Sequence, residues 1–295
     1  MIHFCKMSET FLLIEAALFG LIIGSFLNVC IYRLPLRKSL GGRSFCPHCR
    51  RKIPWYDNVP IISYLILKGR CRYCGGRINL QYPLVEIISA LLSIFTLVHN
   101  AFELDRYFIW YLLFVSPLVV LSFIDLRHRI LPDVITLPGI GAGIAAIFYL
   151  QYPFWKEGLI YSLTGAVIGG GTLLLLGGIY YLIRKREGMG GGDVKLCGML
   201  GAFLGWKGMI FVFLISSILA IFYAVVTLMI PRSPNQPEKE KEPTRPGGPM
   251  IIPYGPFLAM AALIFYFYGL EITTFYFSLV GISSNPIFTP MTPYP

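Results

Sequence analysis

Long apolar runs recur along this chain and are separated by short polar segments. Most of them are close to or above the roughly 17–25 residues that one helix needs to cross a bilayer. The pattern predicts an all-α polytopic membrane protein with about eight transmembrane helices, over residues 11–31, 84–99, 107–124, 134–150, 158–183, 194–204, 209–230 and 252–280. At about 1.5 Å per residue, the run at 194–204 is too short to cross alone. It either recruits the glycines before it or forms a broken, re-entrant segment.

Composition and charge support this interpretation. Of the 295 residues, 56% are hydrophobic and only 14% are charged, which is too apolar for a soluble domain of this length. Most basic residues lie in four loops, at 32–83, at 125–133, at 184–193 with Lys195, and at 231–250. With the N-terminus outside, all four loops face the cytoplasm, as the positive-inside rule favours. The net charge of +10 therefore indicates topology, and we expect no nucleic-acid binding because the charge is spread over separate loops.

We expect three parts along the chain. Residues 1–31 form the first transmembrane helix, an uncleaved anchor because no A-x-A-like cleavage site follows it. Residues 32–83 form a small cytoplasmic insert, and residues 84–295 carry the remaining membrane helices. Within the last part, 231–250 is predicted to be a flexible polar loop, and the Pro-rich tail after Ser283 a loosely ordered terminus.

Four cysteines of the insert form two pairs. Cys46 and Cys49 make one C-x2-C motif, and Cys71 and Cys74 make another about 20 residues later. This spacing is typical of a zinc ribbon, in which each pair presents two thiolates to one tetrahedral ion. Disulfides are the alternative, but a cytoplasmic loop lies in a reducing compartment. We predict a zinc-ribbon-like insert with one structural zinc, which would stabilise a segment too small for a large core.

Two aspartates, Asp125 and Asp193, each lie where a long apolar run meets a short basic segment. A carboxylate at the end of a membrane segment is costly to desolvate, so it faces water or takes part in chemistry. The predicted topology puts both on the cytoplasmic side, where they could share one proton and activate a water molecule, as in aspartic proteases. Asp125 could instead pair with Arg127 or Arg129. Asp193 could simply cap the next helix, which is the role we expect for Asp133.

A run of glycines immediately precedes Asp193. Glycine lets another backbone approach closely, and an extended peptide must lie against backbone to be cut. We therefore predict a non-helical substrate loop over 188–192, which includes Gly190, Gly191 and Gly192. Lys195, two residues past Asp193, either faces the same site or serves only as a topological charge.

These motifs together resemble those of the bacterial type IV prepilin peptidases, also called leader peptidase/N-methyltransferases. The resemblance covers nearly the whole chain and rests on motifs in the same order, namely Gly24-Ser25-Phe26-Leu27-Asn28-Val29, Ile31-Tyr32-Arg33-Leu34-Pro35, the two cysteine pairs, Tyr82-Pro83-Leu84-Val85-Glu86, the segments 125–133 and 188–196, and Ile252-Pro253-Tyr254-Gly255-Pro256. It implies a bacterial inner-membrane aspartic endopeptidase with catalytic Asp125 and Asp193. Such an enzyme removes the basic leader of prepilins or pseudopilins after a glycine.

The resemblance also implies a second activity, methylation of the new N-terminus with S-adenosylmethionine. The family associates this activity with its N-terminal cytoplasmic region, so part of the methyltransferase is expected in the insert. Asn28, Arg33 and Glu86 match motifs there and are our candidates for binding the methyl donor. Glu86 is either an acceptor for the amine proton or a helix-start carboxylate favoured by the dipole. The expected partners are prepilin or pseudopilin substrates and the lipid bilayer; no oligomeric state is predicted.

Three other functions are compatible with paired aspartates in a membrane. A transporter could use them to relay protons or bind an ion, but it would need neither a zinc ribbon nor a glycine loop. A non-enzymatic assembly factor of a pilus or secretion system would not need both carboxylates. A presenilin-like intramembrane protease with other substrates is the nearest alternative, and the cysteine insert and the 252–256 segment favour the prepilin peptidase.

Overall fold

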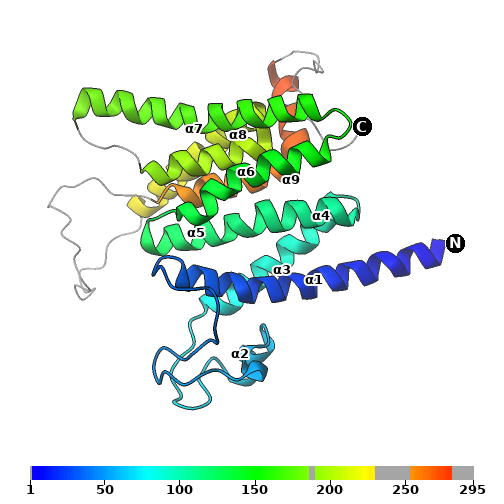
Figure 1. The fold of residues 1–295 in the computed structure, drawn as a ribbon, viewed down its shortest axis with the longest axis vertical. Helices are drawn as coiled ribbons and strands as arrows, with labels where there is room; N and C mark the ends of the chain where they lie inside the picture. Colours follow the sequence, from blue (N-terminus) through cyan, green and yellow to red (C-terminus); the bar gives the residue numbers. More distant parts are fainter. Residues whose placement is uncertain (1, 186–189, 230–252, 281–295) are drawn as a thin grey trace.

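The computed structural model describes residues 2–185, 190–229 and 253–280. The predicted loop at 231–250 and the Pro-rich tail lie outside these residues. In the described part the regular structure is helical, and the only strand-like pairings are two isolated β-bridges in the cysteine insert. In chain order (Figure 1) the elements are α1 (Ile2–Arg33), η1 (Trp55–Asn58), α2 (Ile62–Ile66), α3 (Gln81–His99), α4 (Leu104–Trp110), η2 (Tyr111–Val115), α5 (Ser116–His128), α6 (Asp133–Leu150), α7 (Trp155–Arg184), α8 (Gly191–Met229) and α9 (Gly255–Val280).

Seven helices in the described residues are long and apolar enough to cross a membrane. They are α1 from Glu9 onward, α3, the continuous rod formed by α4, η2 and α5, and then α6, α7, α8 and α9. The chain is therefore an all-α, multi-pass membrane protein, as predicted. At 39 residues, α8 has about twice the length that one crossing requires.

This excess length arises because α8 consists of two helical segments that meet at Gly205. The backbone of Gly205 is not helical (φ 67°, ψ 176°), and the Tyr161 ring lies where a Cβ on this residue would project. The first segment begins at Gly191 and therefore includes two of the glycines before the run at 194–204, and it ends at the break at Gly205. Two of the eight predicted runs thus share α8, which reconciles eight runs with seven helices.

The first segment of α8 lies in the middle of the molecule. Every residue from Leu196 to Gly205 is buried. Gly165 and Gly169 of α7 pack directly against the backbone carbonyl groups of Gly201 and Cys197, a close approach that only small residues permit between membrane helices. The beginning of α8 therefore has a rigid support.

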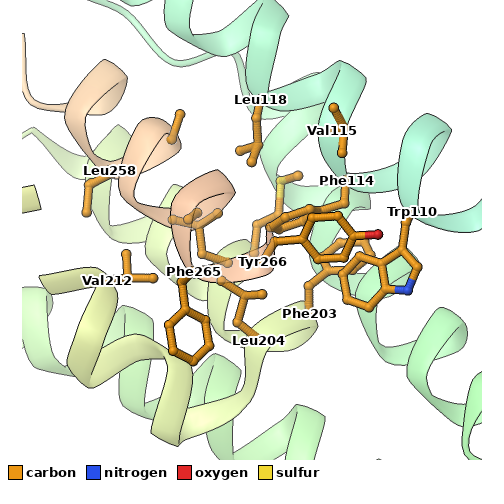
Figure 2. Packing of buried hydrophobic residues seen from close by; sticks show 14 of the residues in the cluster. Trp110, Phe114, Val115, Leu118, Phe203, Leu204, Val212, Leu258, Phe265 and Tyr266 are labelled. Carbon is orange, nitrogen blue, oxygen red and sulfur yellow. The ribbon is translucent and has the colours of Figure 1, made fainter. Parts of the chain in front are cut away.

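Aromatic side chains connect α4, η2, α8 and α9 in the interior (Figure 2). The rings of Phe114 and Phe203 have centroids 5.0 Å apart, and those of Trp110 and Tyr266 are 4.6 Å apart. Such pairs contribute about 0.5–1.5 kcal/mol each beyond the burial of their surface. This packing fixes the positions of the helices that carry the candidate catalytic residues.

Candidate functional site

Asp125 lies in the last turn of α5, which ends where Arg129 adopts a left-handed conformation (φ 53°). Asp125 is buried, with only 6% of its surface exposed. The backbone N–H of Gly255, at the start of α9, donates a hydrogen bond to Asp125 Oδ2 at 3.1 Å. A Cβ at position 255 would lie 2.6 Å from this oxygen, so the contact requires glycine. The sequence alone predicted no role for Gly255, although this residue lies in the 252–256 motif on which the family resemblance partly rests.

Asp193 lies in the first turn of α8. The helix begins two residues earlier, so Asp193 is inside it and is not its N-cap. A carboxylate in a first turn interacts favourably with the helix dipole. The Asp193 backbone N–H donates to the Gly190 carbonyl at 3.1 Å, which fixes the aspartate relative to the preceding chain.

The predicted glycine loop is helical in part. Residues 186–189 lie outside the described residues, Gly190 precedes α8, and Gly191 and Gly192 form the first turn of the helix. A non-helical loop through 192 is therefore wrong; glycines are tolerated here because the first N–H groups of a helix need no partner within it. Gly191 is exposed, and a Cβ there would meet no atom within 4 Å. The described residues thus leave the backbone of Gly191 uncovered.

Lys195 and Asp133 form an ion pair, with Lys195 Nζ 2.7 Å from Asp133 Oδ1. Asp133 is the first residue of α6, and its side chain makes no capping bond because Pro132 occupies the N-cap position. The expectation that Asp133 caps this helix is therefore wrong. Both side chains are largely exposed, so the pair contributes at most about 1 kcal/mol, but it connects the start of α6 to the start of α8.

The Asp125 and Asp193 carboxyl groups lie near enough for the charge of one to act on the other. Arg129 places a positive charge near Asp125, whereas Arg127 donates a hydrogen bond to Gln81 Oε1 at 3.4 Å. Two neighbouring carboxyl groups do not readily ionise together. Such a pair can hold one proton and combine a base with an acid at a single site.

The four cysteines of the insert come together as predicted. Their sulfur atoms all lie within 4.8 Å of one another, and the sulfurs of Cys46 and Cys74 are 3.9 Å apart. A tetrahedral ion with Zn–S bonds of about 2.3 Å places its ligands roughly 3.8 Å apart. The cluster therefore has the size and the donor atoms to hold one metal ion.

The two cysteine pairs have matching backbone geometry. Four residues after each first cysteine, a backbone N–H bonds back to its carbonyl, from Arg50 to Cys46 at 2.8 Å and from Gly75 to Cys71 at 2.9 Å. Arg50 and Gly75 both have positive φ, 56° and 68°. In the second pair, backbone N–H groups of Cys74 and Tyr73 stabilise the Cys71 thiolate and lower the Cys71 pKa to about 7. Despite a backbone hydrogen bond from Gly76, burial and hydrogen bonds with the other cysteines raise the Cys74 pKa to about 11. Metal binding requires the thiolate form, so full ionisation of the cluster needs a bound cation.

A cavity of about 650 Å³ lies between the insert and the ends of α1 and α3, and it is lined in part by Asn28, Arg33 and Glu86. Asn28 Nδ2 donates to the Tyr82 carbonyl at 3.0 Å, while Asn28 Oδ1 is buried without a hydrogen-bond partner. A buried acceptor without a partner is costly, so Asn28 has an acceptor beside the cavity that the described residues leave unused.

The polar groups of the other two candidates already have partners in the protein. The Arg33 guanidinium donates to backbone carbonyls of the segment 39–43, with Leu40 O at 2.9 Å. Glu86 Oε2 accepts the Ile61 N–H at 2.8 Å. Arg33 therefore holds the loop that follows α1, and Glu86 connects the insert to α3 while it lines the cavity.

Two family models match the chain. Residues 18–100 match the Bacterial Peptidase A24 N-terminal domain, and residues 112–225 match the Type IV leader peptidase family. The first match includes α1 from residue 18 onward, the cysteine insert and α3. The second includes Asp125 and Asp193.

The chain is also similar to proteins called "Prepilin leader peptidase/N-methyltransferase". The one from Myxococcus xanthus (strain DK1622) is 40% identical over 211 residues, which are 71% of this chain but only 61% of that protein. The one from Aeromonas hydrophila is 36% identical over 88% of this chain and 91% of its own length. The one from Pseudomonas aeruginosa is 34% identical over 90% and 93%. No solved structure matches the chain.

Proposed function

Because the chain belongs to the type IV leader peptidase family, we propose that it is a membrane aspartic endopeptidase with a second, N-methyltransferase activity. It removes the leader of type IV prepilins or pseudopilins after a glycine and methylates the new N-terminal residue. The observation that carries the proposal is that Asp125, in the last turn of α5, and Asp193, in the first turn of α8, both lie in the segment 112–225 that matches the Type IV leader peptidase family. The names of the relatives give no support to a transporter, an assembly factor or a presenilin-like protease.

In the cleavage step, one carboxylate of the pair takes a proton from water while the other, protonated, donates to the scissile carbonyl oxygen. The water oxygen bonds to the carbonyl carbon, and the C–N bond breaks as the leaving nitrogen takes up a proton. The Gly255 N–H holds one oxygen of Asp125 and so fixes that carboxyl group. Gly190, Gly191 and Gly192 supply the backbone surface against which the extended substrate lies.

Methylation is assigned to the cavity between the insert and α3, where S-adenosylmethionine would supply the methyl group. Asn28 supports this assignment because its buried Oδ1 has no partner. Glu86 lines the same cavity and is placed to accept the proton that the amine loses. Arg33 is needed to shape the cavity wall, since its guanidinium is engaged by loop carbonyls.

The insert is proposed to hold one structural zinc ion through Cys46, Cys49, Cys71 and Cys74. Four thiolates close a tetrahedral site and leave no position for a substrate. Residues 32–83 thus form a zinc-stabilised part of the methyltransferase region, residues 1–31 the first membrane helix, and residues 84–295 the peptidase domain.

We place the protein in the bacterial inner membrane with Asp125 and Asp193 at the cytoplasmic face. The basic loops at this end of the helices support the orientation. Prepilins present their basic leaders on the same side in this arrangement, so leader and aspartates can meet without translocation of the leader.

One experiment tests both activities. The purified protein is mixed with a prepilin, with and without S-adenosylmethionine, and the product N-terminus is analysed by mass spectrometry. We expect a shortened chain in both cases and one that is heavier by a methyl group only when the donor is present. An intact prepilin after incubation with folded protein would refute the proposed function.

A further inference from the structure

The short helix α2 of the insert has two chemically different faces. Ser63, Tyr64 and Leu67 line the cavity. The opposite face carries Ile62, Leu65 and Ile66, which are 56%, 67% and 68% exposed. These three lie at positions i, i+3 and i+4, so they form a single apolar stripe. Contiguous exposed apolar surface of this kind marks a contact with a membrane or another protein.

The surroundings of the stripe are those of a membrane surface. Trp55 in η1 is 82% exposed and Tyr56 beside it is 50% exposed, and aromatic side chains are enriched where proteins meet the bilayer interface. The exposed Lys68 and Arg70 follow directly after α2. Basic residues beside an apolar stripe attract anionic lipid headgroups.

A hydrogen bond sets the depth of α2. The Ile61 N–H, just before α2, donates to Glu86 Oε2 at 2.8 Å, and this bond stabilises an unusual Ile61 backbone (φ 59°, ψ −50°). Glu86 lies about one and a half turns inside α3, within a candidate membrane span. Its Cα also packs against Gly24, which lies within the candidate span of α1.

The insert therefore folds back along the membrane helices and does not extend away from them. Figure 1 shows α2 beneath α1, beside the C-terminal half of that helix. On α1 and α3, Phe26 and Ile87 are 49% and 43% exposed, as expected of lipid-facing side chains. Exposed apolar side chains are thus found on α2 as well as on these two membrane helices.

We propose that the exposed face of α2, together with Trp55, inserts into the bilayer leaflet on the side of the two aspartates and forms the lipid-facing wall of the cavity. Ser63 and Tyr64 then give the cavity a polar inner surface on the side opposite Asn28 and Glu86. The isoleucine and leucine side chains of α2 contact the lipid and separate it from the cavity. The lipid contact is independent of the proposed function. Only the benefit to methylation rests on the role assigned to the cavity.

The test uses the full-length protein in liposomes of phosphatidylcholine and phosphatidylglycerol that contain a phospholipid with a diazirine in its acyl chain. After irradiation, mass spectrometry locates the lipid adducts. We expect adducts on the peptide that contains Leu65 and Ile66, adducts on α1 as an internal reference, and none on the knuckle at 46–52. In a Leu65→Glu/Ile66→Glu variant, the adducts on α2 should be lost while α1 is labelled and the metal content is retained.

Tyr73→Glu is the control. Tyr73 is another exposed residue of the insert, 47% exposed against 67% and 68% for Leu65 and Ile66, but it lies on a cysteine knuckle and not on α2. This variant should keep the adducts on α2. The proposal is overturned if α2 carries no lipid adducts while α1 is labelled, or if the Leu65→Glu/Ile66→Glu variant is labelled as strongly as the wild type. Capture of the prepilin by a photo-crosslinker at position 65, without lipid adducts on α2, would also overturn it and make this face a protein-docking surface.

Discussion

Asp125 and Asp193 lie 68 positions apart in the sequence, at the end of α5 and the start of α8, and the proposed chemistry requires both. Asp125→Asn and Asp193→Asn should each abolish prepilin cleavage. The double variant should be no worse than either single one, because residues that act as a unit have non-additive effects. Gel-shift assays of prepilin processing by each purified variant measure this. Cleavage near the wild-type rate by either single variant would contradict the assignment.

Gly255 provides a more local test of the same site. In Gly255→Ala, the new methyl group would lie 2.6 Å from Asp125 Oδ2, so the carboxyl group must move and loses its N–H donor. A displacement of this kind costs about a hundredfold in rate, which a cleavage time course would reveal. Gly178→Ala is the control, since a Cβ at that position in α7 meets no atom within 4 Å. Equal cleavage rates for the two variants would show that the Gly255 contact is unimportant.

The sequence identified both aspartates, because charged residues at the ends of apolar runs are conspicuous. It gave no role to Gly255, since the contact joins residues 130 positions apart and depends on how α9 packs against α5. The same limit explains Asp133. Its position before an apolar run indicated a cap, whereas the actual partner, Lys195, becomes a neighbour only when α6 and α8 come together.

Among the elements, the cysteine insert has almost no core, because only Cys46 and Ser63 are buried within residues 34–80, so it needs a metal for stability. Purified protein should contain about one zinc ion per chain, and Cys46→Ser/Cys71→Ser should lose it, because each knuckle then retains a single thiolate. Metal analysis by inductively coupled plasma mass spectrometry provides the measurement. Cys30→Ala, which removes a buried cysteine of α1 outside the cluster, should keep its zinc. Zinc retained in full by the double serine variant would exclude these ligands.

The break in α8 is the second feature at this scale. The apolar runs predicted two segments around it, but the sequence could not show how short the connection is. Gly205→Ala should destabilise the protein by at least about 1–2 kcal/mol, because φ is positive there and the Tyr161 ring fills the space. Thermal unfolding in detergent, with Gly171→Ala in an open part of α7 as control, measures the difference. Equal unfolding temperatures for Gly205→Ala and Gly171→Ala would show that position 205 tolerates a side chain.

At the scale of the whole molecule, the last turn of α5 separates the two proposed sites. Asp125 faces Gly255 of α9, whereas Arg127 lines the cavity and contacts Gln81 of α3. Residues two apart on a helix point to nearly opposite sides. A pilin cut at the aspartates therefore has only a short distance to travel to the cavity, and each site keeps its own residues.

Separate sites are also expected on chemical grounds. Cleavage needs water at a polarised amide, whereas methyl transfer needs a neutral amine in line with the sulfonium methyl group. Water beside the aspartates would compete for the position of the amine.

Asp125→Asn should therefore fail to cut a prepilin but should still methylate a pilin that has already been cut. Asn28→Ala and Glu86→Gln should show the reverse, with cleavage largely intact and methylation reduced. Incorporation of labelled methyl groups into pre-cut pilin measures this. If the Asp125→Asn protein remains folded and binds S-adenosylmethionine but transfers no methyl group, the two activities share the aspartates and the cavity is not the methylation site.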